Sequence, residues 1–190
     1  MIKVNSVETD RMKLMSYTMN EDDYIIKLHH KANRLIFDDI DIVDFSVKKL
    51  KDRIKLEIDA NMTIFWICWM KEPVVRVGIV YFSHIVPGMD AALHTILDVE
   101  GYKMYIRNSN NSIRVKVMDE ASKIAISYMF LVLKLQRITE YCFVYNKPMI
   151  NLCKRLGFKE EGIIRHGARV DGKPVDAVVL GLLREEVNGL

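Results

Sequence analysis

The sequence is poor in cysteine, lacks long apolar runs and has no excess of charge of one sign. Its three cysteines, Cys68, Cys142 and Cys153, lie in apolar surroundings without the spacing of a metal site or a disulfide framework, which is typical of reduced thiols. Charged residues interrupt each apolar stretch well before the length of a membrane span, and the segment 1–13 lacks the apolar core of a signal peptide. We therefore expect a cytoplasmic protein with neither a membrane segment nor a metal site.

The balance of charge also argues against a nucleic-acid partner. The 28 basic and 25 acidic residues give a formal charge of only +3, from which no large basic surface can be inferred. Half of the 190 residues are hydrophobic and 28% are charged, which is typical of a folded globular chain. A chain of this length forms one domain with a substantial core.

Hydrophobic periodicity predicts strands and helices over the whole chain, as in a single α/β domain spanning 1–190. Strands are predicted at 2–7, 62–70, 74–85, 91–98 and 137–145, with a strand pair within 162–183, and helices at 22–36, 45–57, 119–136 and 148–156. Between Tyr102 and Val117, apolar residues alternate on both sides of an Asn/Ser turn. This alternation predicts a β-hairpin, 102–117, inserted before the long helix.

The most specific motif lies in the last third of the chain. The segment from Asn146 to Phe158 reads NKPMINLCKRLGF, and it is followed by Glu161-Gly162 and Arg165. This combination resembles the signature of the GNAT superfamily of acyl-CoA N-acyltransferases. The resemblance implies a mixed, twisted sheet that is flanked by helices and splayed between its fourth and fifth strands.

The sequence after this motif resembles one branch of the superfamily. A turn at Asp171-Gly172-Lys173, then Asp176 and the segment GLLREE at 181–186, look like the ending of the enzymes that acetylate ribosomal-protein N-termini. The AALHT strand around His94 is also similar to divergent GNAT-like proteins of bacteriophages, so a phage origin, with the host cytoplasm or the virion as location, is a further expectation. The resemblance implies transfer of acetyl from acetyl-CoA to a primary amine on a protein or a small molecule.

The resemblance also indicates which residues would hold the cofactor. In the superfamily, backbone amides at the start of the long helix bind the CoA pyrophosphate, because unpaired N–H groups and the helix dipole favour an anion. The glycine-rich pattern of this loop falls on 113–118, where Lys116 and Met118 replace both glycines. The candidate cofactor-binding residues are Arg114, Lys116, Val117, Met118, Asp119 and Asn146.

Each of these candidates has a structural alternative. Asp119 is a good helix N-cap, whose carboxylate would compete with a phosphate for the same amides. Arg114 and Lys116 could bind phosphate through their side chains, or could simply face solvent on a hairpin. Asn146 could reach the pantetheine arm, or could cap the short helix.

Catalysis requires a group that takes a proton from the amine and one that protonates the departing thiolate. His94 is the leading candidate base, with His84, His166 and Glu161 as alternatives, and a hydrogen-bonded core histidine is the structural alternative. Many family members have a tyrosine as acid on the short helix, where this chain has Cys153. Another branch has a serine near the start of that helix, where this chain has Met149. Cys153 is a candidate acid, although a buried cysteine is more often a core residue.

Two main hypotheses therefore remain open, and cofactor binding without turnover is a third, milder possibility. The first is an active N-acetyltransferase in which His94 is the base and Asn146, Arg114 and Lys116 hold acetyl-CoA. The second is a GNAT scaffold without catalysis, which binds a protein partner and uses the predicted hairpin 102–117 as an added interaction element. The missing glycines and the missing tyrosine favour the second hypothesis, whereas the retained C-terminal motif favours the first.

Overall fold

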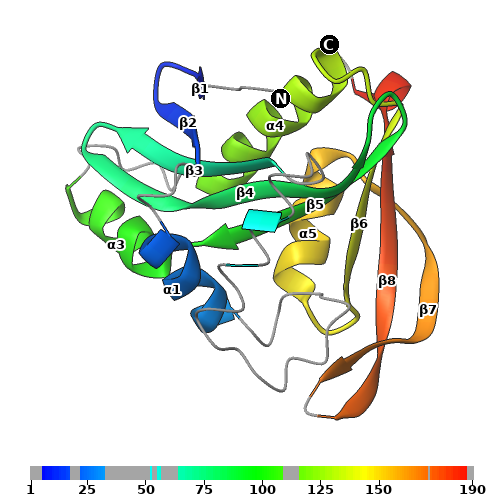
Figure 1. Ribbon diagram of the computed structural model, residues 1–190. Helices are drawn as coiled ribbons and strands as arrows, with labels where there is room; N and C mark the ends of the chain where they lie inside the picture. The colour runs from blue at the N-terminus through cyan, green and yellow to red at the C-terminus, as the bar shows by residue number, and fades with distance from the viewer. Residues whose placement is uncertain are drawn as a thin grey trace.

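The computed structural model describes residues 6–17, 22–32, 64–108, 116–170 and 172–187, together with helical residues at Asp52, Lys55 and Leu56. These residues form one eight-stranded sheet with helices on both faces (Figure 1). The strands are β1 (Ser6–Glu8), β2 (Met12–Ser16), β3 (Ile64–Lys71), β4 (Val74–Val86), β5 (Asp90–Leu97), β6 (Arg137–Phe143), β7 (Lys159–Val170) and β8 (Lys173–Leu183). The helices are α1 (Asp22–Ala32), α3 (Val99–Asn108), α4 (Val117–Leu131) and α5 (Lys147–Leu156), and a 3-10 turn follows at Arg184–Glu186.

The sheet has the strand order β1-β2-β3-β4-β5-β6-β8-β7. All neighbouring strands are antiparallel except β5 and β6, which are parallel and in register at the single pair Ala92 and Thr139. Beyond this pair the two strands diverge. The splay that the sequence predicts between strands 91–98 and 137–145 is therefore present between β5 and β6.

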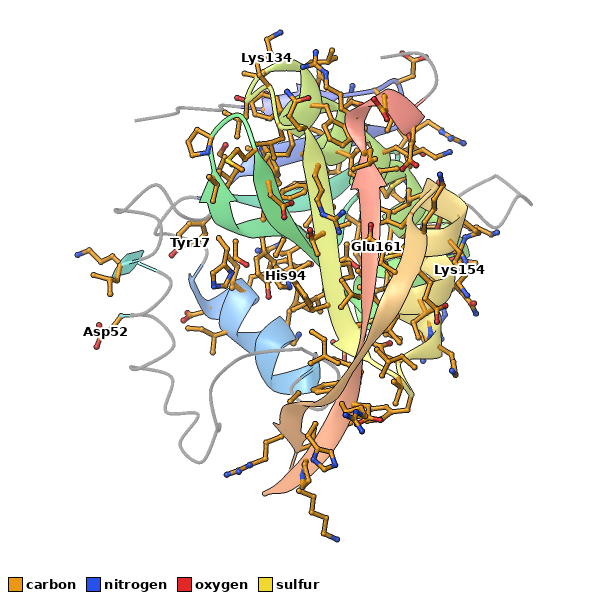
Figure 2. All side chains as sticks on the ribbon, turned by 90° about the vertical axis from the view of Figure 1, so that its right-hand side faces the viewer. Tyr17, Asp52, His94, Lys134, Lys154 and Glu161 are labelled. Carbon is orange, nitrogen blue, oxygen red and sulfur yellow. The ribbon has the colours of Figure 1, made fainter. Side chains whose placement is uncertain are left out.

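Two apolar clusters hold the helices on opposite faces of the sheet. The larger one packs α4 and α5 against side chains such as Phe82, Leu93 and Ile138. The smaller one packs Ile25 and Leu28 of α1 against the other face of β3, β4 and β5. Figure 2 shows this arrangement, with α1 on one side of the strands and α5 on the other. No helix in the described part of the chain is long and apolar enough to cross a membrane.

Most predicted elements are confirmed within a few residues of their bounds, including both strands of the C-terminal pair and the short helix α5. The long helix begins at Val117, two residues before the predicted start, and ends at Leu131 rather than at 136. Strand β2 was not predicted, because its five residues MKLMS adjoin a polar stretch and give a weak signal. The predicted helix at 45–57 lies outside the described residues, apart from Asp52, Lys55 and Leu56.

The predicted β-hairpin at 102–117 is wrong. Residues from Val99 to Asn108 form helix α3 instead, and Val117 begins α4, while 109–115 lie outside the described residues. Asp98 starts α3, since its Oδ1 accepts hydrogen bonds from the amides of Glu100 and Gly101 at 3.2 and 3.3 Å. The apolar residues of this segment alternate as in a strand, but the segment forms a helix in which Tyr105 is the buried residue.

Gly101 lets α3 pack directly on β4. A Cβ atom at this position would overlap the carbonyl oxygen of Arg76 in the neighbouring strand. Only a residue without a Cβ permits this approach of helix and strand backbones.

We predict that Gly101→Ala lowers the free energy of unfolding by about 1–3 kcal/mol, the usual range for overpacking a tight contact. Urea denaturation measures the change. Gly162→Ala is the matched control, because a Cβ there meets no atom within 4 Å. Equal stabilities of the two variants would contradict the close packing of α3 on β4.

Candidate functional site

A cavity of about 680 Å³ lies at the splay between β5 and β6. Its walls come from β5 and β6, from α3, from the first turn of α4 and from the start of α5. The sequence-predicted residues His94, Lys116, Val117, Met118, Asp119 and Asn146 all line it. Arg114 lies outside the described residues, so its place in the site stays a prediction.

The first turn of α4 presents backbone amides to the cavity. Lys116 is the N-cap residue, and its side chain accepts no hydrogen bond from the amides of this turn. The amides of Asp119 and Glu120 bond to the carbonyl oxygen of Lys116 at 2.9 and 3.2 Å. The helix end therefore has the polarity of an anion-binding site.

Met118 stands at a position where the GNAT pattern has a glycine, and its side chain packs against the sheet. The residue is buried, and its sulfur lies 3.0 Å from the point where a Cβ of Gly78 would stand. Gly78 of β4 thus leaves room for the Met118 side chain against the sheet.

Asp119 does not cap α4, contrary to the sequence-based prediction. It is the third residue of the helix, and its carboxylate accepts two hydrogen bonds from Arg155 of α5: Nε to Oδ2 at 2.6 Å and Nη2 to Oδ1 at 2.8 Å. This bidentate pair raises the pKa of Arg155 and offsets the negative charge of Asp119. The Asp119 carboxylate is thus engaged by Arg155, whose side chain lines the same cavity as the first turn of α4.

His94 lies on β5 opposite Tyr81 of β4, and the two rings stack with centroids 4.5 Å apart. Its Nε2 is 2.7 Å from the hydroxyl of Ser83, and the same hydroxyl is 2.9 Å from Nδ1 of His84. Ser83 is buried, whereas His84 is exposed at an irregularity of β4 with a φ of 52°. A hydrogen-bonded chain therefore links the cavity residue His94 to the surface. Figure 2 shows His94 in the interior, between α1 and the strands.

The other candidate bases, His166 and Glu161, lie outside the cavity. His166 is on β7 with a φ of 52°, and its amide donates to Asp176 of β8 at 2.8 Å. Glu161 pairs with Arg137, which lowers the pKa of the Glu161 carboxyl. Neither residue lines the cavity.

Asn146 precedes α5, and its Oδ1 accepts a hydrogen bond from the amide of Met149 at 3.3 Å. Asn146 therefore caps α5, which is the structural alternative that the sequence left open. Because Asn146 also lines the cavity, its role in binding a ligand stays a prediction.

Cys153 is completely buried on α5 and is not among the residues that line the cavity. Burial, with a smaller contribution from Glu140, raises the pKa of its thiol. Burial raises the pKa of Cys68 on β3 as well, and raises that of Cys142 on β6 to about 12. The three thiols have the environment of core residues.

Glu140 is a cavity residue that the sequence analysis missed. It lies on β6 directly after the last contact of β6 with β5, it is 4% exposed, and its Oε2 has no hydrogen-bond partner among the described residues. Burial raises its pKa well above the ordinary value. The signal in the sequence was a lone acidic residue between Ile138 and Cys142, at the parity of the buried face.

A polar network closes the narrow end of the splay. Arg137 donates from Nε to Thr139 at 2.9 Å and from Nη1 to Glu161 at 2.8 Å, and Thr139 donates to Asp90 of β5 at 2.8 Å. The Arg137–Glu161 pair crosses β8 at Gly181, where a Cβ would overlap both side chains. β5, β6 and β7 are thereby tied together beside the point where the cavity opens.

Comparison with solved structures identifies the fold. No family model and no curated protein sequence matches this chain. A spermidine N-acetyltransferase from Vibrio cholerae, solved with CoA and spermine, superposes with a TM-score of 0.75 at 17% identity, covering 94% of this chain and 98% of the other. The chain has the GNAT fold.

Two further structures agree with this assignment. A ribosomal-protein-S5-alanine acetyltransferase from Vibrio fischeri has a TM-score of 0.71 at 17% identity, with 95% and 97% of the two chains covered. A ribosomal L7/L12 α-N-protein acetyltransferase in complex with CoA has a TM-score of 0.73 at 13% identity, with 96% and 99% covered. At these identities the likeness concerns the fold, and it gives no support for a phage origin.

The buried Glu140 makes the stability of this protein depend on pH. Because its pKa is raised in the folded state, stability falls as pH increases from 4.5 through the folded-state pKa. Glu140→Gln removes this titration, so we expect the variant to gain stability relative to the parent as pH rises. Urea denaturation between pH 4.5 and 8.5 measures the difference.

Glu161→Gln is a control, because the contribution of Glu161 to stability changes with pH in the opposite direction. The Glu161 pKa is lowered, so the parent's advantage over this variant should shrink as pH falls below 4.5, which the same denaturation series measures when it is extended to lower pH. A constant difference between parent and Glu140→Gln across the pH range would show that Glu140 is not held protonated.

Proposed function

We propose that this protein transfers an acetyl group from acetyl-CoA to a primary amine. The observation that supports this best is a single cavity that joins the first turn of α4, which the side chain of Lys116 does not cap, to His94 through the splay of β5 and β6. One end suits an anionic cofactor and the other holds a group able to accept a proton.

The CoA pyrophosphate would bind at the first turn of α4. The amides at Val117 and Met118 would donate to phosphate oxygens, and Lys116 and Arg155 would add positive charge. Arg155 would keep Asp119 from repelling the ligand. This arrangement replaces the family's glycine loop with side-chain charge, so binding should be sensitive to salt.

The diverging strand β5 would position the thioester. β5 is paired with β6 only at Ala92, so the edge of β5 beyond Ala92 offers backbone groups to a ligand lying in the splay. Its amides would hold the acetyl carbonyl and stabilise the tetrahedral oxyanion. Asn146 would border the pantetheine arm.

His94 would act as the base. The amine nitrogen attacks the thioester carbon, the C–S bond breaks, and the proton leaves the nitrogen for the imidazole. Ser83 would orient the imidazole through Nε2 and link it to the exposed His84. The proton could then pass along this chain to solvent.

The acceptor belongs to the class of primary amines. Two of the solved structures are named for different acceptors, spermidine in one and a ribosomal protein in another. The C-terminal segment that resembles ribosomal-protein acetyltransferases favours a protein N-terminus for this chain.

An inactive scaffold that binds a protein partner is the competing function. The absence of the family's glycines and tyrosine favours it. One argument for the scaffold no longer holds, because residues 102–108 of the expected interaction hairpin belong to helix α3.

Cofactor binding is the first test. We expect acetyl-CoA and CoA to bind with a Kd on the order of micromolar in calorimetric titration, and Arg155→Ala to weaken binding about tenfold or more, because it also leaves Asp119 unpaired beside the phosphates. Adding Asp119→Asn to Arg155→Ala should restore part of the affinity.

Lys154→Ala is the matched control, since Lys154 pairs with Glu160 at 3.0 Å on the outer face of α5 (Figure 2). It should bind like the parent. Absence of binding by the parent at millimolar ligand would rule out the enzyme and leave the scaffold.

Turnover tests the role of His94. With acetyl-CoA and either spermidine or a peptide that begins with alanine, we expect His94→Gln to lower kcat by about 100-fold or more while its affinity for CoA is kept. Release of the CoA thiol measures the rate. His166→Gln should react like the parent, because His166 lies outside the cavity. A His94→Gln variant with full activity would exclude His94 as the base.

A further inference from the structure

Acyl transfer from CoA leaves a thiolate that must take up a proton. At the position where the family resemblance places a tyrosine acid, this chain has Cys153, which is fully buried and does not line the cavity. Met149, at the other family position, has no proton to give. The proposed reaction therefore requires a donor that the family motif does not supply.

Glu140 has the location of such a donor. It lines the cavity at the start of the splay, it is 4% exposed, and its Oε2 is buried without a hydrogen-bond partner in the described part of the chain. Among the described residues it is the one carboxylate with such an atom. An unpaired buried oxygen costs free energy in the folded protein, and a catalytic role is one explanation for its presence.

The Glu140 carboxyl lies near the position of the missing tyrosine. Glu140 is among the groups that raise the pKa of the Cys153 and Cys142 thiols, since a carboxylate at this position disfavours a nearby thiolate, so the three groups are close together. Cysteine is much shorter than tyrosine. Glu140 thus lies close to the residue that stands where the family places its tyrosine.

Glu140 and His94 approach the cavity from opposite faces of the sheet. Glu140 has the parity of Ile138 and Cys142, which pack on the α4 and α5 side. His94 stacks on Tyr81, which packs on the α1 side. One face therefore carries a candidate base, and the face that holds the first turn of α4 carries a second protonatable group.

We propose that the Glu140 carboxylic acid donates its proton to the CoA thiolate as the C–S bond breaks, replacing the tyrosine that this chain lacks. The thiolate leaves as the neutral thiol, and Glu140 is left as a carboxylate. Water that enters as the products leave returns a proton to it. The amine's own proton goes to His94, so one proton is accepted and one is donated in each turnover.

The surroundings of Glu140 favour its protonated form. Burial raises its pKa, and the titratable groups that interact with it are the thiols of Cys142 on β6 and Cys153 on α5, whose own pKa values are raised. Across the cavity are His94 of β5 with Tyr81 of β4, and Lys116 of α4 with the Asp119–Arg155 pair. Helix α3 adds Glu100, Tyr102 and Lys103. An acid that is neutral at working pH is able to donate a proton, as the reaction requires.

This inference rests on the proposed acetyl transfer, and its test separates the two. The pH dependence of kcat is measured for the parent and for Glu140→Gln, which keeps the shape of the side chain but has no acidic proton. We expect the parent rate to fall at alkaline pH as Glu140 loses its proton. Glu140→Gln should be about 100-fold slower and should lack this alkaline limb, with its affinity for acetyl-CoA unchanged.

A second measurement does not depend on the acceptor. Infrared difference spectra between parent and Glu140→Gln should contain the C=O stretch of a protonated carboxylic acid at neutral pH. Absence of this band would overturn the proposal.

The remaining outcomes are equally decisive. An active parent with an equally active Glu140→Gln, or a Glu140-dependent rate that rises with pH as for a base, would overturn the role of Glu140 while leaving acetyl transfer in place. A parent that neither binds acetyl-CoA nor releases thiol would remove the proposed function, and the inference with it.

Discussion

The site depends on how β5 and β6 separate. The two strands are held together at Ala92 and Thr139 and at the preceding turn, where the amides of Gln136 and Arg137 both donate to the carbonyl oxygen of Met89. The hydrogen bond from Thr139 to Asp90 and the Arg137–Glu161 pair reinforce this junction from the side chains. The strands are parallel and paired at one end only, and they diverge toward the other. The cavity, the accessible edge of β5 and the position of Glu140 all result from that divergence.

The sequence predicted the fold better than it predicted the site. The motif from Asn146 to Phe158 determines α5, its cap and the following strand through local interactions, and such interactions can be inferred from residue spacing. Helix α3 was mistaken for a hairpin because Tyr102, Met104 and Ile106 fit a period of two. The contact that decides for the helix, between Gly101 and Arg76 of β4, joins residues that are distant in sequence.

The partners of the charged residues in the site could not be predicted from neighbouring sequence either. Asp119 looks like a cap when its neighbours in sequence are considered alone, yet Arg155, 36 residues later, engages its carboxylate. Glu140 gains its properties from burial beneath α5, which only the tertiary structure reveals. Local sequence therefore identified the residue types that the cavity contains, whereas the partner of each charge was determined by packing between α4, α5 and the sheet.

The burial of the three cysteines has a practical consequence for work with this protein. Cys68, Cys142 and Cys153 belong to β3, β6 and α5, and each thiol is held in its neutral form inside the core. Reagents that attack thiolates can reach these sulfurs only when the surrounding element opens. The rate at which the native protein is alkylated therefore reports how often each of these elements detaches from the core, and the cysteines are natural probes of local opening on both sides of the splay.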